Sequence, residues 1–188
     1  MIPKHGVVSL LDRSATEKVR RTWDRLEREF GLRGVRVMPF PHFTYQIAEG
    51  YDRPGVEETL AELARATPPF EISTQGLATF GGDLPVIFVA VEADPSLRAL
   101  HERLWTSVTP RARGPVAYYS PGSWVPHITL AHGEERNTIP LPAVSVERVL
   151  AALDPAEFRW EVTIDNYALV WDEATIQRPV ATFPLGRR

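Results

Sequence analysis

The sequence contains the same short pattern twice, and each copy places a threonine two residues after a histidine. Residues 41–44 are Pro-His-Phe-Thr and residues 126–129 are Pro-His-Ile-Thr. An imidazole has an ordinary pKa near ~6.5, so at neutral pH one of two histidines can take up a proton while the other gives one. His42 and His127 therefore predict acid–base catalysis that needs neither a metal nor a cofactor.

The threonines suggest what the histidines act on. If each copy forms a strand, His42 and Thr44 share one face, as do His127 and Thr129, while Tyr45 belongs to the opposite, core face. A displacement at phosphorus needs a base beside the nucleophile and an acid beside the leaving oxygen, and two hydroxyls can donate to the non-bridging oxygens. The pattern favours phosphoester chemistry in a cleft lined by both copies.

The hydrophobic pattern predicts a mixture of helices and strands around both copies. The expected helices are Thr16–Phe30 with Ser14 as its N-cap, Pro54–Ala66, Pro95–Val108 and Ser145–Leu153. The expected extended segments are Gly6–Leu11, Val35–Met38, the two motifs, Phe70–Phe80, Leu84–Val91, Phe158–Val170 and Thr182–Phe183. Hairpin-type turns such as Gly81-Gly82-Asp83 favour an α+β fold with mainly antiparallel sheet and flanking helices.

The order of elements after the two motifs is also repeated. A helix and then a strand follow each copy at similar separations. This repetition indicates an internal duplication, and it predicts two intertwined lobes related by a pseudo-twofold axis around a central cleft. We expect residues 1–188 to form one bilobal domain with one motif in each lobe.

Composition narrows the classes of protein. The chain has no cysteine, which excludes disulfides, thiolate catalysis and cysteine–zinc sites. The net charge of −3 argues against binding nucleic acid by charge alone. No apolar run approaches the ~18 residues of a membrane span, and the N-terminal residues do not resemble a signal peptide. We therefore expect a cytoplasmic monomer without a membrane partner.

Five residues before the second motif are further candidates for substrate binding. Arg111 and Arg113 would clamp a phosphate or an RNA end, or else they are solvated loop arginines. Tyr118, Tyr119 and Trp124 would stack on a nucleobase, or else they pack between the lobes.

Two other histidines have simpler interpretations. His132 lies five residues after His127, so strict strand alternation predicts that it faces away from the cleft and disfavours a metal pair between them. His101 falls within an expected helix and is predicted to lie at the surface.

The doubled His-x-Thr motif resembles that of the 2H phosphoesterase superfamily, and within it the 2′-5′ RNA ligase-like (LigT-like) cyclic phosphodiesterases. The resemblance implies metal-independent hydrolysis of 2′,3′-cyclic phosphates, or related 2′-linked phosphodiesters, of nucleotides or RNA ends. It implies no cofactor. His42 and His127 would be the catalytic acid and base, and Thr44 and Thr129 would bind the phosphate.

Two alternatives remain beside hydrolysis. The same groups would run RNA 2′-5′ end joining in the reverse direction, or the cleft would belong to a non-catalytic module that binds nucleotides or RNA ends. The sequence leaves open which histidine is the acid and which is the base.

Overall fold

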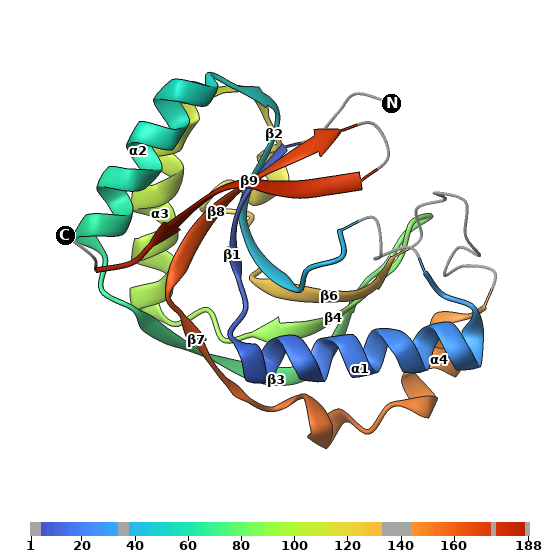
Figure 1. Ribbon diagram of the computed structural model, residues 1–188. Coiled ribbons are helices and arrows are strands. Elements are labelled where there is room, and N and C mark those ends of the chain that lie inside the picture. The colour runs from blue at the N-terminus through green and yellow to red at the C-terminus, as the bar shows by residue number, and fades with distance from the viewer. Residues whose placement is uncertain (1–4, 34–37, 133–143, 174–175, 187–188) are drawn as a thin grey trace.

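The structure is a computed structural model, and it describes residues 5–33, 38–132, 144–173 and 176–186. Of the expected extended segment Val35–Met38 before the first motif, residues 35–37 lie outside the described residues. Figure 1 shows two groups of strands, with helices α2 (Arg53–Ala66) and α3 (Pro95–Val108) side by side next to one group and helix α1 (Arg13–Phe30) next to the other.

The strands form two antiparallel sheets. The five-stranded sheet has the order β5-β2-β1-β8-β9, and the four-stranded sheet has the order β6-β4-β3-β7. The strands are β1 (His5–Leu10), β2 (His42–Tyr51), β3 (Phe70–Phe80), β4 (Val86–Val91), β5 (Ala112–Pro115), β6 (His127–His132), β7 (Glu161–Ile164), β8 (Asn166–Glu173) and β9 (Ile176–Pro184). This arrangement confirms the predicted bilobal α+β fold, with one motif strand in each sheet.

The helices cover the outer faces of the sheets. Helices α2 (Arg53–Ala66) and α3 (Pro95–Val108) pack on the five-stranded sheet, and α1 (Arg13–Phe30) contacts β6 of the other sheet. The shorter helical elements are α4 (Val146–Ala152), η2 (Thr109–Arg111), η3 (Ala117–Tyr119) and η5 (Pro155–Phe158). No described helix has the length and apolar character needed to cross a membrane.

Helix α1 begins one turn earlier than the sequence predicts. Asp12, not Ser14, is its N-cap, and the Asp12 carboxylate accepts a hydrogen bond from the Ala15 amide at 2.8 Å. An aspartate side chain satisfies an amide at a helix start as well as a serine does, so sequence pattern alone does not choose between neighbouring caps. The helix ends at Gly31, whose φ of 71° suits glycine.

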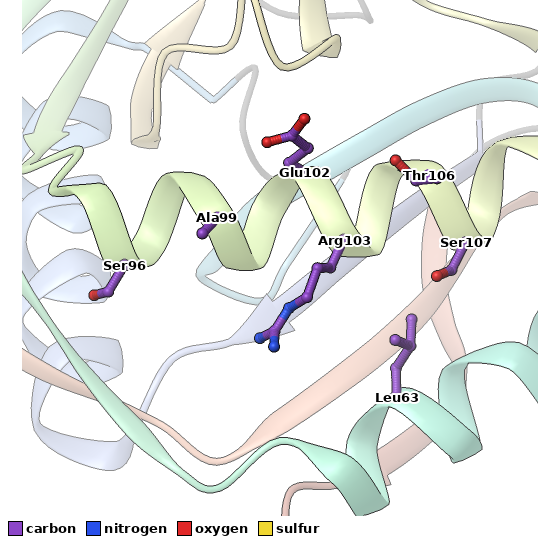
Figure 2. A pocket seen from close by; sticks show the side chains of 7 residues that line it. All are labelled: Leu63, Ser96, Ala99, Glu102, Arg103, Thr106 and Ser107. Atoms are coloured by element: carbon purple, nitrogen blue, oxygen red, sulfur yellow. The ribbon is translucent and has the colours of Figure 1, made fainter.

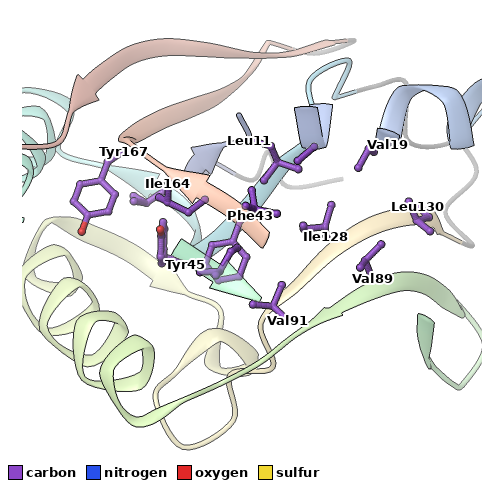
Figure 3. Close-up of a cluster of buried hydrophobic side chains, with 14 of the residues drawn as sticks. Leu11, Val19, Phe43, Tyr45, Val89, Val91, Ile128, Leu130, Ile164 and Tyr167 are labelled. Atoms are coloured by element: carbon purple, nitrogen blue, oxygen red, sulfur yellow. The ribbon is translucent and has the colours of Figure 1, made fainter. Parts of the chain in front are cut away.

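One large hydrophobic core connects both sheets with the helices. Figure 3 shows part of it, with Tyr167 and Tyr45 of the five-stranded sheet toward one end, Phe43 and Ile128 between, and Leu130 of the four-stranded sheet toward the other end. These five side chains are almost fully buried. Burial of this kind is the main favourable term in folding, so the core holds the two motif strands in a fixed relation.

On the opposite face of the five-stranded sheet, the hydrophobic cluster contains no helix residue within the described part of the chain. A small group of side chains packs there: Val8, Ala168 and Val170, with Leu10 and Phe40 partly buried beside them. We call this side of the sheet its helix-free face. Side chains along the strands of this sheet therefore alternate between the face that the helices cover and the helix-free face. A cleft between two lobes requires a face of the second kind.

Candidate functional site

The two motifs lie on neighbouring strands of different sheets. His42 begins β2 and His127 begins β6, and these strands contact each other although they belong to separate ladders. Positive charge on His127 lowers the pKa of His42, so the two imidazoles are close enough to interact electrostatically. The fold therefore brings together two histidines that are far apart in the sequence.

Both imidazole rings are oriented by the same hydrogen bond. Nδ1 of His42 lies 3.0 Å from the carbonyl oxygen of Phe40, and Nδ1 of His127 lies 2.8 Å from that of Val125. A carbonyl oxygen only accepts, so Nδ1 carries the hydrogen in each ring. In the neutral form each histidine then presents Nε2 with a free lone pair, which is the form that a general base requires.

A one-residue β-bulge follows the threonine of the first motif. On the ladder between β1 and β2, Thr44 lies opposite Val8 but Gln46 lies opposite Val7. Tyr45 is therefore an extra residue on β2. A bulge of this kind bends the strand and re-aims the side chains on either side of it.

The second motif has a bulge at the same offset. On the ladder between β4 and β6, Thr129 lies opposite Phe88 but Ala131 lies opposite Ile87, which makes Leu130 the extra residue. In both copies the bulge comes three residues after the histidine. The similarity of the two halves thus extends to the backbone irregularity beside each threonine.

The first motif divides its side chains between two environments. His42 and Thr44 lie opposite β1 residues of the helix-free face, and paired residues of an antiparallel ladder share a face. Phe43 and Tyr45 are both fully buried in the main core. The predicted alternation is confirmed for these four residues, including the core position of Tyr45.

The second motif is divided in the same way. Thr129 lies opposite Phe88, whose ring also lies 5.2 Å from the ring of His127, so the three share one face of the sheet. Ile128 and Leu130 are buried in the main core. Each motif therefore presents one imidazole and one hydroxyl on the face that points away from the core.

The prediction for His132 is wrong. It lies opposite Val86 on β4, which places it on the same face as Phe88 and Thr129. The physical reason is the extra residue Leu130, which shifts the alternation by one and turns His132 toward the motif face.

Burial determines the charge of both motif histidines. Desolvation lowers the pKa of His42 to about 4, with the charge of His127 as a smaller cause in the same direction. Burial also lowers the pKa of His127, while its hydrogen bond to the Val125 carbonyl partly opposes this effect. Both rings are therefore neutral at pH 7 in the unliganded protein, and an anion between them would raise both pKa values.

The two threonine hydroxyls are free to bind a ligand. Within the described part of the chain, neither Thr44 Oγ1 nor Thr129 Oγ1 has a hydrogen-bond partner. Thr44 is buried and Thr129 is half-buried. A free hydroxyl in a partly desolvated place donates strongly to an anion.

Phenylalanine rings surround the histidines, and the sequence interpretation missed them. The ring of Phe40 lies 5.5 Å from that of His42, and the ring of Phe80 lies 5.1 Å from that of His127. In the sequence, Phe80 comes directly before the predicted Gly81-Gly82-Asp83 turn. This position at the end of a hairpin strand is the sequence feature that could have pointed to Phe80. Tyr118 is 44% exposed and packs edge-on against Phe80 at 5.5 Å, which brings this candidate to the edge of the site.

The two other aromatic candidates have structural surroundings. Tyr119 is half-buried and packs against the main core. Trp124 is only 4% exposed, and its indole donates to the Thr44 carbonyl at 3.0 Å. Trp124 is therefore packed beneath the motif strand, and a nucleobase has no access to its faces.

The two arginines lie at the far end of β2. Arg113 is opposite Gly50, about 25 Å along the strand from His42 at ~3.3 Å per residue. Arg111 lies 3.8 Å from the carboxylate of Asp52, and both arginines are exposed. The short strand β5 pairs with this end of β2, so neither arginine is part of the candidate site.

His101 is buried, and its predicted surface position is wrong. It is 1% exposed, lies on the core side of α3, and stacks on Trp124 at a ring distance of 3.8 Å and an angle of 4°. Its Nε2 lies 3.0 Å from the Tyr45 carbonyl oxygen. From the sequence alone, a polar histidine within a helix is assigned to the surface. The backbone carbonyl that accepts its hydrogen bond, and so allows its burial, is known only from the fold.

Two surface hollows lie away from the motifs. One of about 720 Å³ runs between α2 and α3, lined by side chains such as Leu63, Ala99 and Arg103 (Figure 2). Another of about 460 Å³ lies beside α1 near Arg21 and Trp160. Among the described residues, no group of three histidine, aspartate or glutamate side chains is arranged to hold a metal ion.

Comparison with known proteins agrees with this geometry. A family model described as the 2′-5′ RNA ligase superfamily matches residues 15–175. Comparison with curated protein sequences gave no match. The fold resembles TT0787 of Thermus thermophilus, with a TM-score of 0.62, 18% identity, and coverage of 97% of this chain and 98% of that one. It also resembles Escherichia coli LigT in its apo form (TM-score 0.56) and in a complex with 3′-AMP (TM-score 0.57), each 15% identical with both chains fully covered.

Proposed function

Because the chain belongs to the 2′-5′ RNA ligase superfamily, we propose that it is a metal-independent phosphoesterase that opens 2′,3′-cyclic phosphates of nucleotides or RNA ends. The observation that carries the proposal is the matched pair of histidines. Nδ1 of His42 and Nδ1 of His127 each donate to a backbone carbonyl, and each ring therefore presents Nε2 to a ligand. One ring can then act as the base and the other as the acid.

The reaction needs only groups that the two motifs supply. One imidazole takes a proton from water as the water oxygen bonds to phosphorus. The other imidazole gives a proton to the ribose oxygen as its bond to phosphorus breaks, so one water is consumed. Thr44 and Thr129 would donate to the non-bridging oxygens, where negative charge grows.

The substrate itself adjusts the protonation of the pair. Burial lowers the pKa values of both histidines, and repulsion between two imidazolium rings disfavours double protonation. A cyclic phosphodiester carries one negative charge, which stabilises one imidazolium beside it. We therefore propose that binding recruits one proton and prepares one acid and one base.

A small ligand suits this chain better than a long RNA. The net charge is −3, which gives little attraction for an extended phosphate backbone. LigT was crystallised with 3′-AMP, a mononucleotide. We propose that the ligand is a nucleotide or the last nucleotides of an RNA strand, and that the chain acts as one bilobal domain.

The test is hydrolysis in the presence of EDTA. Purified protein is incubated with 2′,3′-cyclic AMP and with a short RNA that ends in a 2′,3′-cyclic phosphate, and products are followed by ³¹P NMR. We expect a monoester to appear at either the 2′ or the 3′ position. Binding of these ligands without turnover would instead support a non-catalytic binding module, and the absence of both would overturn the proposal.

A further inference from the structure

A tryptophan donates to the motif threonine in each half of the molecule. The indole Nε1 of Trp124 lies 3.0 Å from the carbonyl oxygen of Thr44, and the indole Nε1 of Trp23 lies 3.4 Å from that of Thr129. Both tryptophans are buried to the same degree, each with 4% of its surface exposed. The two come from different elements, since Trp23 lies on α1 and Trp124 precedes β6.

These hydrogen bonds fall where the strands are irregular. Each threonine is the last residue before the extra residue of its bulge, which is Tyr45 in β2 and Leu130 in β6. A bulge disturbs the ladder and leaves backbone groups in need of other partners. An indole N–H is a donor only, and burial excludes water as a competitor, so it is well suited to hold a carbonyl there.

We infer that Trp23 and Trp124 are equivalent positioning residues, each fixing the bulge that aims the threonine hydroxyl and the histidine of one motif at the phosphate. Neither tryptophan touches the reacting atoms. The inference rests on the proposed function for its catalytic consequence. Its structural content, a tryptophan that holds each bulge, is independent of the substrate.

The bulge of the first motif has a second donor. His101 stacks on Trp124 and places Nε2 3.0 Å from the Tyr45 carbonyl oxygen. The carbonyls of Thr44 and Tyr45 are thus both held, by two rings that are themselves packed together. Trp124 also precedes His127 by three residues. The tryptophan that supports the first motif therefore lies in the segment that leads into the second motif.

The experiment compares three conservative substitutions. Trp23→Phe and Trp124→Phe remove the indole N–H and keep an aromatic ring. Trp160→Phe is the matched control, because Trp160 is also buried and its indole donates to the carbonyl of Glu157, away from both motifs. Each variant is assayed with 2′,3′-cyclic AMP, and urea unfolding gives its stability.

We expect kcat to fall about 10- to 100-fold in Trp23→Phe and Trp124→Phe, because a small misplacement of a catalytic group has an effect of that size. KM should change less than about threefold, and the pH profile should keep its shape, since the histidines remain. Trp160→Phe should keep its kcat even if it loses comparable stability. Equal kcat in all three variants, or losses that only follow stability, would overturn the inference.

A second measurement separates this inference from the proposed function. Imidazole ¹⁵N and ¹H resonances report the surroundings of His42 and His127 without any substrate. Trp124→Phe should shift those of His42, and Trp23→Phe those of His127, while Trp160→Phe leaves both in place. If these shifts occur but the wild-type protein shows no turnover, the proposed function is wrong and the inference stands. If the shifts do not occur, the inference is wrong. If Trp124→Phe does not fold, His101→Phe tests the same bulge by removing the donor to the Tyr45 carbonyl, together with the hydrogen bond of His101 to the Tyr119 backbone.

Discussion

Nδ1 of His42 and Nδ1 of His127 each donate to the backbone carbonyl two residues earlier in the chain, so the two rings present the same atom, Nε2. The first prediction follows from this equivalence. His42→Ala and His127→Ala should each lower kcat by about 10²- to 10⁴-fold, the usual contribution of one general acid or base. Steady-state kinetics with 2′,3′-cyclic AMP measures the loss.

The double variant adds a check on the pair. Because the acid and the base act in one step, His42→Ala with His127→Ala should be little worse than either single variant. Circular dichroism should show the same fold in all three. Full activity in either single variant would rule out the paired mechanism.

The threonine hydroxyls should matter for catalysis and not for stability. Thr44→Val and Thr129→Val keep the side-chain shape, and each should lower kcat by about 10²-fold, as the loss of one donor to a developing charge does. Thr74→Val is the contrasting variant, because its buried hydroxyl bonds to the Phe158 carbonyl and the Trp160 amide. It should lose about 1–3 kcal/mol of stability and keep kcat. Steady-state kinetics and urea unfolding of all three variants test this prediction. If Thr44→Val lost stability but kept its kcat, the catalytic role of the Thr44 hydroxyl would be contradicted.

Protonation of His127 should oppose protonation of His42. The charge of His127 is one of the causes that lower the pKa of His42 to about 4. ¹⁵N NMR titration of the protein without ligand should therefore show that the two rings do not gain their protons independently. His127→Gln should raise the pKa of His42, and an unchanged value would mean that the rings do not interact.

His42 should also make the protein sensitive to acid. Its pKa is near 6.5 in the unfolded chain and about 4 in the folded protein. Its contribution is fully present above pH 6.5 and is lost as the pH falls toward 4, because the unfolded chain takes up the proton first. At pH 5 we expect a loss of about 1–2 kcal/mol relative to pH 7, since the ring keeps some contact with water. Urea unfolding should show a smaller loss in His42→Gln, and an identical loss would refute this source.

Tyr118 is the most exposed of the three aromatic candidates. It is exposed and packs on Phe80, which in turn contacts His127. Tyr118→Ala should raise KM for a cyclic nucleotide by about 5- to 100-fold, the range expected for one stacked base. Arg113→Ala is the control, and its KM should not change because Arg113 lies at the other end of β2. An unchanged KM in Tyr118→Ala would remove Tyr118 from the site.

The sequence was sufficient for the features that depend on local pattern. The doubled motif predicted two strands that the fold brings into contact. Strand alternation assigned the faces of His42, Thr44, His127 and Thr129, because each pair lies before its bulge. The helix Pro95–Val108 was predicted with the bounds that the structure shows.

The features that depend on long-range partners could not be predicted in this way. The face of His132 changes with an extra residue that only the pairing with β4 reveals. The positions of Arg111 and Arg113 depend on which end of β2 the strand β5 pairs with. The burial of His101 depends on a stack with Trp124, which follows it by more than twenty residues in the chain. In each case the deciding neighbour is remote in sequence.

The bulge after each threonine shifts the alternation of faces by one residue for the rest of its strand. Downstream of Tyr45, Ala48 is fully buried and Glu49 is partly exposed. If Tyr45 instead took the ladder position opposite Val7, regular alternation would turn the carboxylate of Glu49 toward the core. Deleting Tyr45 would have the opposite result, because Gln46 would stay opposite Val7 and the residues after it would keep their faces. The faces of the later residues therefore depend on whether the extra residue stays outside the ladder.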